Sequence, residues 1–191
     1  MLDRISSRDA GRIGLAAAAV SLAAIFIAIA LFDGFSYTDN FLSDLGRPAP
    51  SSYIFNSGML AGGMLGFIFS VKLINMDYYK SRLGMKFFVL SSVSLALVGM
   101  FPVYTDMPHT GSSFLFFMFS VCALIAIGYS ERKEGLHGLV FLALGILSLT
   151  TLPLYAVPRP YGTNAVVELV TTLSVIIFVL ITSARLIRIK F

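Results

Sequence analysis

The feature that most constrains this chain is a series of six apolar runs separated by short polar breaks. Each run has about 20 residues, the length that an α-helix needs to cross the hydrocarbon core of a bilayer. The composition agrees, because 57% of the residues are hydrophobic and only 13% are charged, about half the charged share of a soluble domain. We expect one all-α domain over residues 1–191, an integral membrane bundle of six transmembrane helices. The expected spans are residues 13–32, 52–74, 83–104, 110–130, 136–157 and 163–186.

The positive charges are distributed unevenly between the two sides of this predicted bundle. Six spans place both termini on one side. Of the 14 Lys and Arg residues, Arg47 and Arg159 fall on the other side, which leaves 12 beside the termini. Lys and Arg concentrate in the cytoplasmic segments of membrane proteins. We therefore expect a multi-pass protein of the cell membrane with both termini in the cytoplasm.

The longest polar break in the chain is residues 33–56, between the first two spans. It contains Asp44 and Arg47, and Asn56 lies one turn inside the second span. We expect this segment to cover the outer mouth of the bundle, with a pocket beneath it. Two interpretations of Asp44 stay open: it caps a helix or pairs with Arg47, or it belongs to a binding site.

Glu168 is the most informative single residue, because it lies inside the sixth span, about 9 Å along the helix axis from the turn at Gly162. A carboxylate at membrane depth is costly and marks a functional site by default, with a partner to be found. Either Glu168 fixes helix packing by bonding to Arg159 or His109, or it binds a ligand or a proton. The polar residues that share its helix face are Asn164, Thr171 and Thr172.

Further polar residues lie in the turns on the same side as the long polar break. Asp106 and His109 lie between the third and fourth spans, and Arg159 lies between the fifth and sixth. His109 is either an interfacial turn residue or a base or ligand contact beside Asp44 and Glu168. The candidate ligand-binding residues are Asp44, Arg47, Asn56, Asp106, His109, Arg159, Asn164 and Glu168. The pattern assigns no catalytic residue.

The histidines and the cysteine bear on metals and cofactors. His109 and His137 begin spans on opposite sides of a hydrocarbon core about 30 Å thick, so they cannot ligate one haem iron. A catalytic zinc takes three protein ligands, His109 is the one histidine on the outer side, and Cys122 lies mid-span. We expect no metal and no cofactor. The scattered Lys and Arg form no basic patch, so we expect no nucleic-acid binding.

Small residues recur every four positions along the second span. They are Gly58, Gly62, Gly66 and Ser70. Such a face lets another helix approach closely. Tight packing within the bundle is the simpler interpretation. The alternative is a homo-oligomer or a partner membrane protein that binds through this face.

Three stretches resemble a known family. They are Asn40-Phe-Leu-Ser-Asp-Leu-Gly46, Phe55-Asn-Ser-Gly58, and Gly99-Met-Phe-Pro102 followed by His109. Their order, spacing and placement between spans resemble the multi-pass membrane family catalogued as domain of unknown function 998, which is frequent in archaea. The resemblance covers nearly the whole chain. It implies a six-span helical membrane protein and supplies no activity. The family's recurrent residues map onto Ser43, Asp44, Gly46, Pro102 and His109.

The sequence leaves three functions open. The first is non-enzymatic: the bundle binds membrane lipids, another amphiphile or a partner protein through an outward-facing polar pocket. The second is an intramembrane or interfacial lipid-modifying enzyme, with Asp44, His109 and Glu168 as acid and base groups. The third is a small transporter or channel that uses Glu168. In each case we expect Glu168 to point into the bundle and to meet polar groups from other segments.

Overall fold

Six long helices make up most of the computed structural model, which describes residues 5–156 and 164–188. They are α1 (Ser7–Leu31), α2 (Ser51–Asn75), α3 (Arg82–Met100), α4 (Met107–Glu131), α5 (Leu136–Thr151) and α6 (Ala165–Arg188). Three short 3-10 helices lie in the connections: η2 (Leu42–Gly46), η3 (Val103–Thr105) and η4 (Leu152–Ala156). The described ranges contain no strand, and six helical stretches in them are long and apolar enough to cross a membrane; the fifth is α5 continued into η4, as far as Leu154. The predicted all-α, six-span architecture is therefore confirmed.

The ends of the helices follow from local chemistry as well as from hydropathy. The α1 helix begins at Ser7, well before the apolar run, because the Ser6 hydroxyl accepts the N–H of Asp9 at 3.1 Å and so caps the helix. The α3 and α5 helices end two residues before Pro102 and Pro153, each of which lacks a backbone N–H. A 3-10 helix follows each of these ends, so both helices are shorter than the apolar runs.

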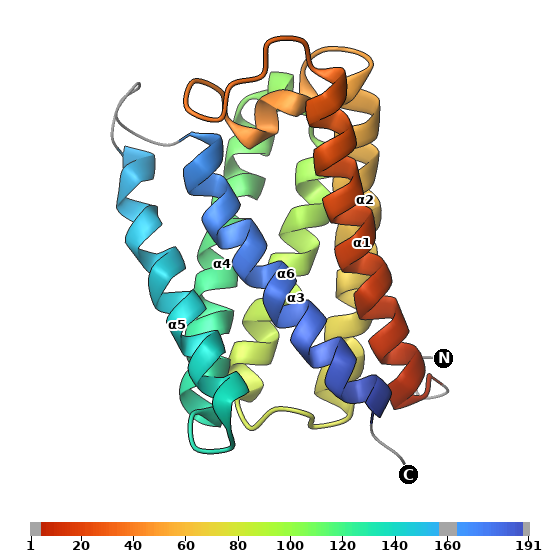
Figure 1. Cartoon of the computed structure of the whole chain (residues 1–191), viewed down its shortest axis with the longest axis vertical. Helices are drawn as coiled ribbons and strands as arrows, with labels where there is room; N and C mark the ends of the chain where they lie inside the picture. The colour runs from red at the N-terminus through yellow and green to blue at the C-terminus, as the bar shows by residue number, and fades with distance from the viewer. Residues whose placement is uncertain (1–4, 157–163, 189–191) are drawn as a thin grey trace.

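The helices close into a ring. Each helix packs against the next one in sequence, and α6 packs against α1. Both termini lie at the same end of the bundle, which we call the terminal end (Figure 1). Residues 33–50, which we call the capping segment, cross the opposite end, and we call that the capped end (Figure 1). The capping segment thus closes the ring on the side away from the termini.

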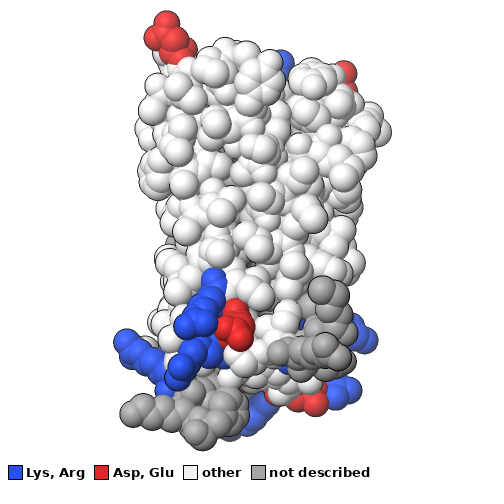
Figure 2. Space-filling view, turned by 90° about the vertical axis from the view of Figure 1, so that its right-hand side faces the viewer, with Lys and Arg blue, Asp and Glu red and all other residues white. Residues whose placement is uncertain are grey.

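Charged side chains gather at the ends of the bundle and leave an uncharged belt between them. Figure 2 shows most of the Lys and Arg side chains of one face at the terminal end, below a broad belt without them, and a small blue patch at the capped end. Large apolar side chains are exposed on the helices that form the belt, among them Phe26, Phe67 and Ile146. A protein that spans a bilayer needs such a surface, with an apolar belt against the lipid chains and charged residues at the two aqueous ends.

The small-residue face of α2 is covered by helices of this chain. A Cβ atom added at Gly58 would lie 2.0 Å from the Cβ of Ala24, and one added at Gly62 would lie 2.1 Å from the hydroxyl oxygen of Ser21. Both contacts are with α1, so the two backbones approach more closely than a side chain allows. Farther along the same face, Gly66 lies beside α3. The face therefore packs within the bundle.

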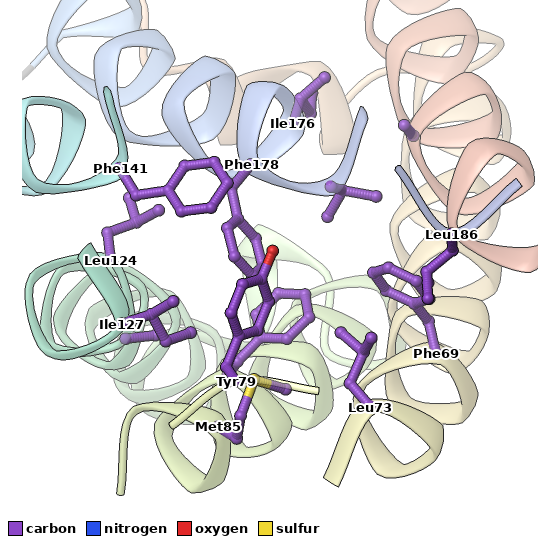
Figure 3. Close-up of a cluster of buried hydrophobic side chains, with 14 of the residues drawn as sticks. Phe69, Leu73, Tyr79, Met85, Leu124, Ile127, Phe141, Ile176, Phe178 and Leu186 are labelled. Carbon is purple, nitrogen blue, oxygen red and sulfur yellow. The ribbon is translucent and has the colours of Figure 1, made fainter. Parts of the chain in front are cut away.

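Two clusters of buried apolar side chains fill the bundle, one toward each end. The cluster at the terminal end is rich in aromatic rings, and Tyr79 lies among them (Figure 3). Its ring centroid lies 5.9 Å from that of Phe178 and 6.2 Å from that of Phe141. The cluster at the capped end is mainly aliphatic and includes Leu42 and Leu45 of η2. Each end is thus closed by side chains from a connecting segment.

Candidate functional site

The capping segment places two leucines inside the end of the bundle. Leu42 and Leu45 are buried in one cluster with Ile25 of α1 and Phe55 of α2. The η2 helix that carries them contacts α1, α2 and α6. The segment predicted to cover the mouth of the bundle therefore also inserts apolar side chains into it, where they pack against the helices.

Backbone hydrogen bonds tie the capping segment to the first turn of α6. The first N–H groups of an α-helix have no partner within the helix. Here the N–H of Ala165 donates to the carbonyl of Asn40 at 2.8 Å, and the N–H of Val166 donates to the carbonyl of Tyr37 at 3.3 Å. The start of the last helix is thus completed by a segment that lies far earlier in the chain.

Glu168 forms a further hydrogen bond between the same two segments, in which the capping segment is the donor and α6 is the acceptor. Its side chain is 5% exposed and points into the bundle, where Oε2 accepts the N–H of Leu42 at 2.5 Å. Hydrogen bonds from a backbone amide offset much of the cost of burying a carboxylate. This described partner is a backbone group, which the sequence does not single out; Arg159, one of the partners predicted for Glu168, lies outside the described residues. We call this bond and the two backbone bonds to α6 the clasp.

Asp44 is used within the capping segment itself. Its Oδ2 accepts the N–H of Phe41 at 2.8 Å, and its Oδ1 accepts Nε of Arg47 at 3.1 Å. The first bond caps the start of η2. The Arg47 side chain is 60% exposed, so the ion pair adds little to stability. The geometry favours the cap and the ion pair for Asp44.

The two candidate asparagines brace the same region. Asn56 of α2 donates from Nδ2 to the carbonyl of Gly46 at 3.4 Å and so supports the end of η2 from below. Asn164 precedes α6, and its Oδ1 accepts the N–H of Val167 at 3.2 Å. This is an N-cap, which satisfies another of the free N–H groups at the start of α6.

His109 is buried in the first turn of α4. Its Nδ1 lies 2.7 Å from the carbonyl oxygen of Phe101, which can only accept, so Nδ1 carries the proton and donates it. In the neutral imidazole Nε2 is then an acceptor, and the Ser113 hydroxyl donates to it over 3.3 Å. Asp106 precedes this helix with an exposed side chain and φ of 52°. Arg159 lies outside the described residues.

The two histidines are too far apart to ligate one metal ion. His109 lies in the first turn of α4 and His137 follows the last, so about 35 Å of helix separates them. Among the residues that the structure describes, no three His, Cys, Asp or Glu side chains lie close enough together to hold a metal ion.

A cavity of about 80 Å³ lies inside the bundle beneath the capping segment. Close-packed interiors rarely contain voids much larger than a water molecule. Side chains of η2, α1, α2, α3, α4 and α6 line it. Among the candidate site residues that the structure describes, Glu168 alone belongs to the lining. The polar lining residues include Ser21, Ser43, Ser92, Ser113, Glu168 and Thr172.

The lining changes in character along the bundle axis. Glu168 lies in the first turn of α6, and Ser113 lies two turns into α4, so both are near the capped end. Phe88 and Val179 line the cavity from parts of α3 and α6 that are closer to the terminal end. The cavity lining is therefore mixed near the capping segment, where Leu42 lies beside Glu168, and apolar toward the terminal end.

The serines of this cavity are not among the candidate residues predicted from the sequence. Ser21, Ser92 and Ser113 each interrupt an apolar helix, and each is buried or partly buried. A small polar residue in a membrane helix usually faces a neighbouring helix, because lipid offers it no hydrogen bond. That rule could have marked these positions. It could not have shown that they surround a common cavity, because this depends on how the helices are rotated.

No curated protein and no solved structure matches the chain. A model of the family described as Protein of unknown function (DUF998) matches residues 15–185, which covers all six helices at least in large part. The family description names no activity, so the function has to be argued from the site. This chain belongs to the DUF998 family of proteins of unknown function.

Proposed function

We propose that this protein binds a lipid or another amphiphile in the cavity beneath the capping segment. The observation that carries the proposal is the cavity itself, which is lined mainly by apolar side chains and has Glu168 and hydroxyl groups in the part nearer the capped end. An amphiphile has the same two parts. Its head would lie under η2 and its chain between the helices.

Polar contacts and shape, rather than water exclusion, would supply the selectivity of such a site. A lipid chain that leaves the bilayer for the cavity moves from one apolar surrounding to another, so the hydrophobic effect contributes little. What changes is the packing around the chain and the hydrogen bonding of the head group. The buried carboxylate of Glu168 is therefore the group on which binding is expected to depend most.

Acid and base catalysis has less support from this geometry. Of Asp44, His109 and Glu168, only Glu168 lines the cavity. Asp44 caps η2, and both ring nitrogens of His109 lie within hydrogen-bonding distance of a protein partner. Binding therefore accounts for the arrangement with fewer assumptions than catalysis.

Native mass spectrometry of gently solubilised protein tests the proposal. The informative variant is Ala18→Leu, which fills the cavity from α1, and its matched control is Ala19→Leu, which adds the same atoms at the neighbouring exposed position. We expect the wild type and Ala19→Leu to carry a bound amphiphile, and Ala18→Leu to lose most of it. Val175→Leu, which fills the cavity from α6, is a second variant if the first folds poorly.

Two results would contradict the proposal. One is a wild-type protein that carries no bound molecule after extraction in several mild detergents. The other is equal retention by Ala18→Leu, Val175→Leu and the Ala19→Leu control, which would place the bound molecule on the outer surface of the helices.

We further propose that the terminal end faces the cytoplasm and the capped end faces outward, because the positive charges surround the termini. Single cysteines in a Cys122→Ser background test this orientation. In intact cells a membrane-impermeant maleimide should label Asp39→Cys and Met107→Cys, which are exposed at the capped end. It should leave Ser6→Cys and Glu134→Cys unlabelled until the membrane is opened. The reverse pattern would invert the orientation.

A further inference from the structure

We propose that α6 is a movable wall of the cavity and that the amphiphile is a lipid of the bilayer, which enters sideways between α1 and α6. This inference rests on the proposed function and adds the source of the ligand and its route. It comes from a difference in how closely the helices approach one another. Helices α1 to α5 are joined by close contacts, whereas α6 is held near its two ends.

The closest of these contacts leave no room for a side chain. A Cβ atom added at Gly63 of α2 would lie 2.3 Å from the backbone nitrogen of Ala96 of α3. One added at Gly128 of α4 would lie 2.3 Å from the backbone nitrogen of Leu142 of α5. The contact between α1 and α2 described above is of the same kind. Helices whose backbones meet in this way gain dispersion energy along their whole seam, so they move as one unit.

The seam between α3 and α4 completes this unit. A Cβ atom added at Gly84 of α3 would lie 3.0 Å from the backbone nitrogen of Ile127 of α4. Farther along the seam, the buried hydroxyls of Ser91 and Ser120 lie 2.7 Å apart and form a hydrogen bond between the two helices. We call α1 to α5 the fixed arc.

The half of α6 near the terminal end is anchored to the fixed arc. A Cβ atom added at Gly14 of α1 would lie 2.2 Å from the hydroxyl oxygen of Ser183. The neighbouring hydroxyl of Thr182 lies 2.7 Å from that of Tyr79. Phe178 belongs to the aromatic cluster at the same end (Figure 3). This half of α6 is therefore the pivot.

The other half of α6 is held differently. Thr172 and Val175 face the cavity, and α6 itself contains no glycine. At its start the helix is tied by the clasp, whose bonds go to a connecting segment. Figure 1 shows α6 crossing the bundle obliquely, beside α1 at the terminal end and apart from it toward the capped end. The capping segment fills the wide end of this seam, and the cavity lies beneath it.

A small movement of α6 would open this seam. From Ser183 to the first turn of α6 is about 22 Å, so a swing of about 10° moves that turn by about 4 Å, the separation of two packed carbon atoms. The seam faces the lipid chains in the half of the bilayer nearer the capped end. A lipid chain could thus pass directly from the bilayer into the cavity, whereas an amphiphile from water would have to pass the capping segment.

Distances between spin labels test the movement. Val166 of α6, Tyr53 of α2 and Phe114 of α4 are exposed near the capped end. Cysteines at these positions, in a Cys122→Ser background, are labelled in pairs and measured by double electron–electron resonance in nanodiscs. Glu168→Ala removes one bond of the clasp. We expect it to add a longer distance to the pair on α6 and α2, and to leave the pair on α2 and α4 unchanged.

A reversible cross-link tests the route. The carbonyl of Asn40 accepts the N–H of Ala165, which brings Asn40→Cys and Ala165→Cys within reach of a disulfide bond. The probe is a set of vesicles made from lipids of host cells grown in deuterated medium, and native mass spectrometry follows the replacement of the co-purified molecule by its heavy form. The oxidised protein should exchange about tenfold more slowly than the same protein after reduction, because the cross-link prevents the opening. Tyr37→Cys with Val166→Cys is a second pair if the first does not cross-link.

The outcomes separate this inference from the proposed function. If oxidation leaves the exchange rate unchanged, or if the bound molecule is never replaced by a deuterated lipid, entry from the bilayer past α6 is overturned. The amphiphile site still stands in that case, provided that Ala18→Leu loses the bound molecule. Equal broadening of both label pairs, or no change in either, would overturn the movement of α6. If the wild type carries no bound molecule, the proposed function fails, and the label distances still decide whether α6 moves.

Discussion

The capped end and the terminal end of the bundle are closed by the same device. At the capped end, Glu168 of α6 accepts the backbone N–H of Leu42, 126 residues away. At the terminal end, the buried Glu131 of α4 accepts the backbone N–H of Lys80 at 2.9 Å, 51 residues away. In both places a buried glutamate on one helix holds the backbone of a distant connection.

The two ends differ in what the held connection inserts. At the terminal end, Tyr79 enters the aromatic cluster (Figure 3). Its hydroxyl lies 2.7 Å from that of Thr182. At the capped end, Leu42 and Leu45 enter an aliphatic cluster, and the cavity extends up to Leu42. We infer that the terminal end is a fixed closure and that the capped end is the one that opens onto the cavity.

The largest effect should come from removing the aromatic closure. Tyr79→Ala deletes a buried ring from the cluster, so we expect a loss of about 3 kcal/mol in the free energy of unfolding. Thermal unfolding of the solubilised protein measures it. Tyr129→Ala, at an exposed ring near the same end, is the control. A Tyr79→Ala protein as stable as this control would show that the terminal end is no fixed closure.

Substitution of the buried glutamate at each end should have a different effect at the terminal end than at the capped end. Glu131→Ala and Glu168→Ala each leave a backbone N–H without its acceptor, at a cost of about 1–3 kcal/mol. We expect Glu131→Ala to lower the stability of the whole bundle. We expect Glu168→Ala chiefly to speed amide exchange in residues 37–46, by roughly tenfold or more.

Hydrogen exchange followed by mass spectrometry, together with the unfolding midpoint, reads out both effects. Glu134→Ala is the control, because Glu134 is exposed and forms only a surface ion pair with Lys80. If Glu168→Ala lowers the midpoint as much as Glu131→Ala and leaves exchange in the capping segment unchanged, the distinction between the ends is lost.

A smaller effect isolates the hydroxyl of Tyr79. Tyr79→Phe keeps the ring in the cluster and removes the hydrogen bond with Thr182, so we expect a loss of about 1 kcal/mol at neutral pH. Thr182→Val should cost a similar amount, and the double variant little more than either. Additive losses would mean that the two hydroxyls do not act as a pair.

The smallest effect is a dependence on alkaline pH. Burial raises the pKa of the Tyr79 phenol above its usual value of 10.0, so the unfolded chain releases this proton at a lower pH than the folded protein. Stability therefore falls as the pH rises through 10, by about 0.8 kcal/mol at pH 10.5. Tyr79→Phe should lack this contribution. The difference between the two proteins should then shrink from pH 9 to pH 10.5 in chemical unfolding experiments.

The architecture could be predicted because it depends on properties that each residue carries alone. Hydropathy located the six helices, although α3 ends at Met100, before the predicted bound at residue 104, because Pro102 follows. The burial of Glu168 could also be anticipated, because the cost of a carboxylate in the membrane does not depend on the details of the fold. Each of these predictions uses a property of one residue or one stretch of sequence, and none requires knowing which distant residues lie nearby in the fold.

The partners of the site residues could not be predicted in the same way. Glu168 meets the backbone of Leu42, and backbone groups look alike in a sequence until the fold places one of them. Glu131 is buried at the end of α4, and its bond to the backbone N–H of Lys80 could not be predicted, because 51 residues separate the two in the sequence. The long polar break predicts a pocket beneath it, but the side chains that line the cavity cannot be read from the sequence, because they come from five long helices and from η2.

The clasp has a consequence for how the protein is made. Residues 37–42 leave the ribosome long before residues 165–168, yet each of these short stretches supplies the hydrogen-bond partners of the other. Chains are synthesised from the N-terminus at about 5–20 residues per second, so the capping segment waits several seconds for α6. During that interval its unpaired groups, the carbonyls of Tyr37 and Asn40 and the N–H of Leu42, are available to the insertion machinery and to chaperones. The clasp can form only once α6 is in place, so closure of the cavity is the last step of assembly and indicates that the last helix has been inserted.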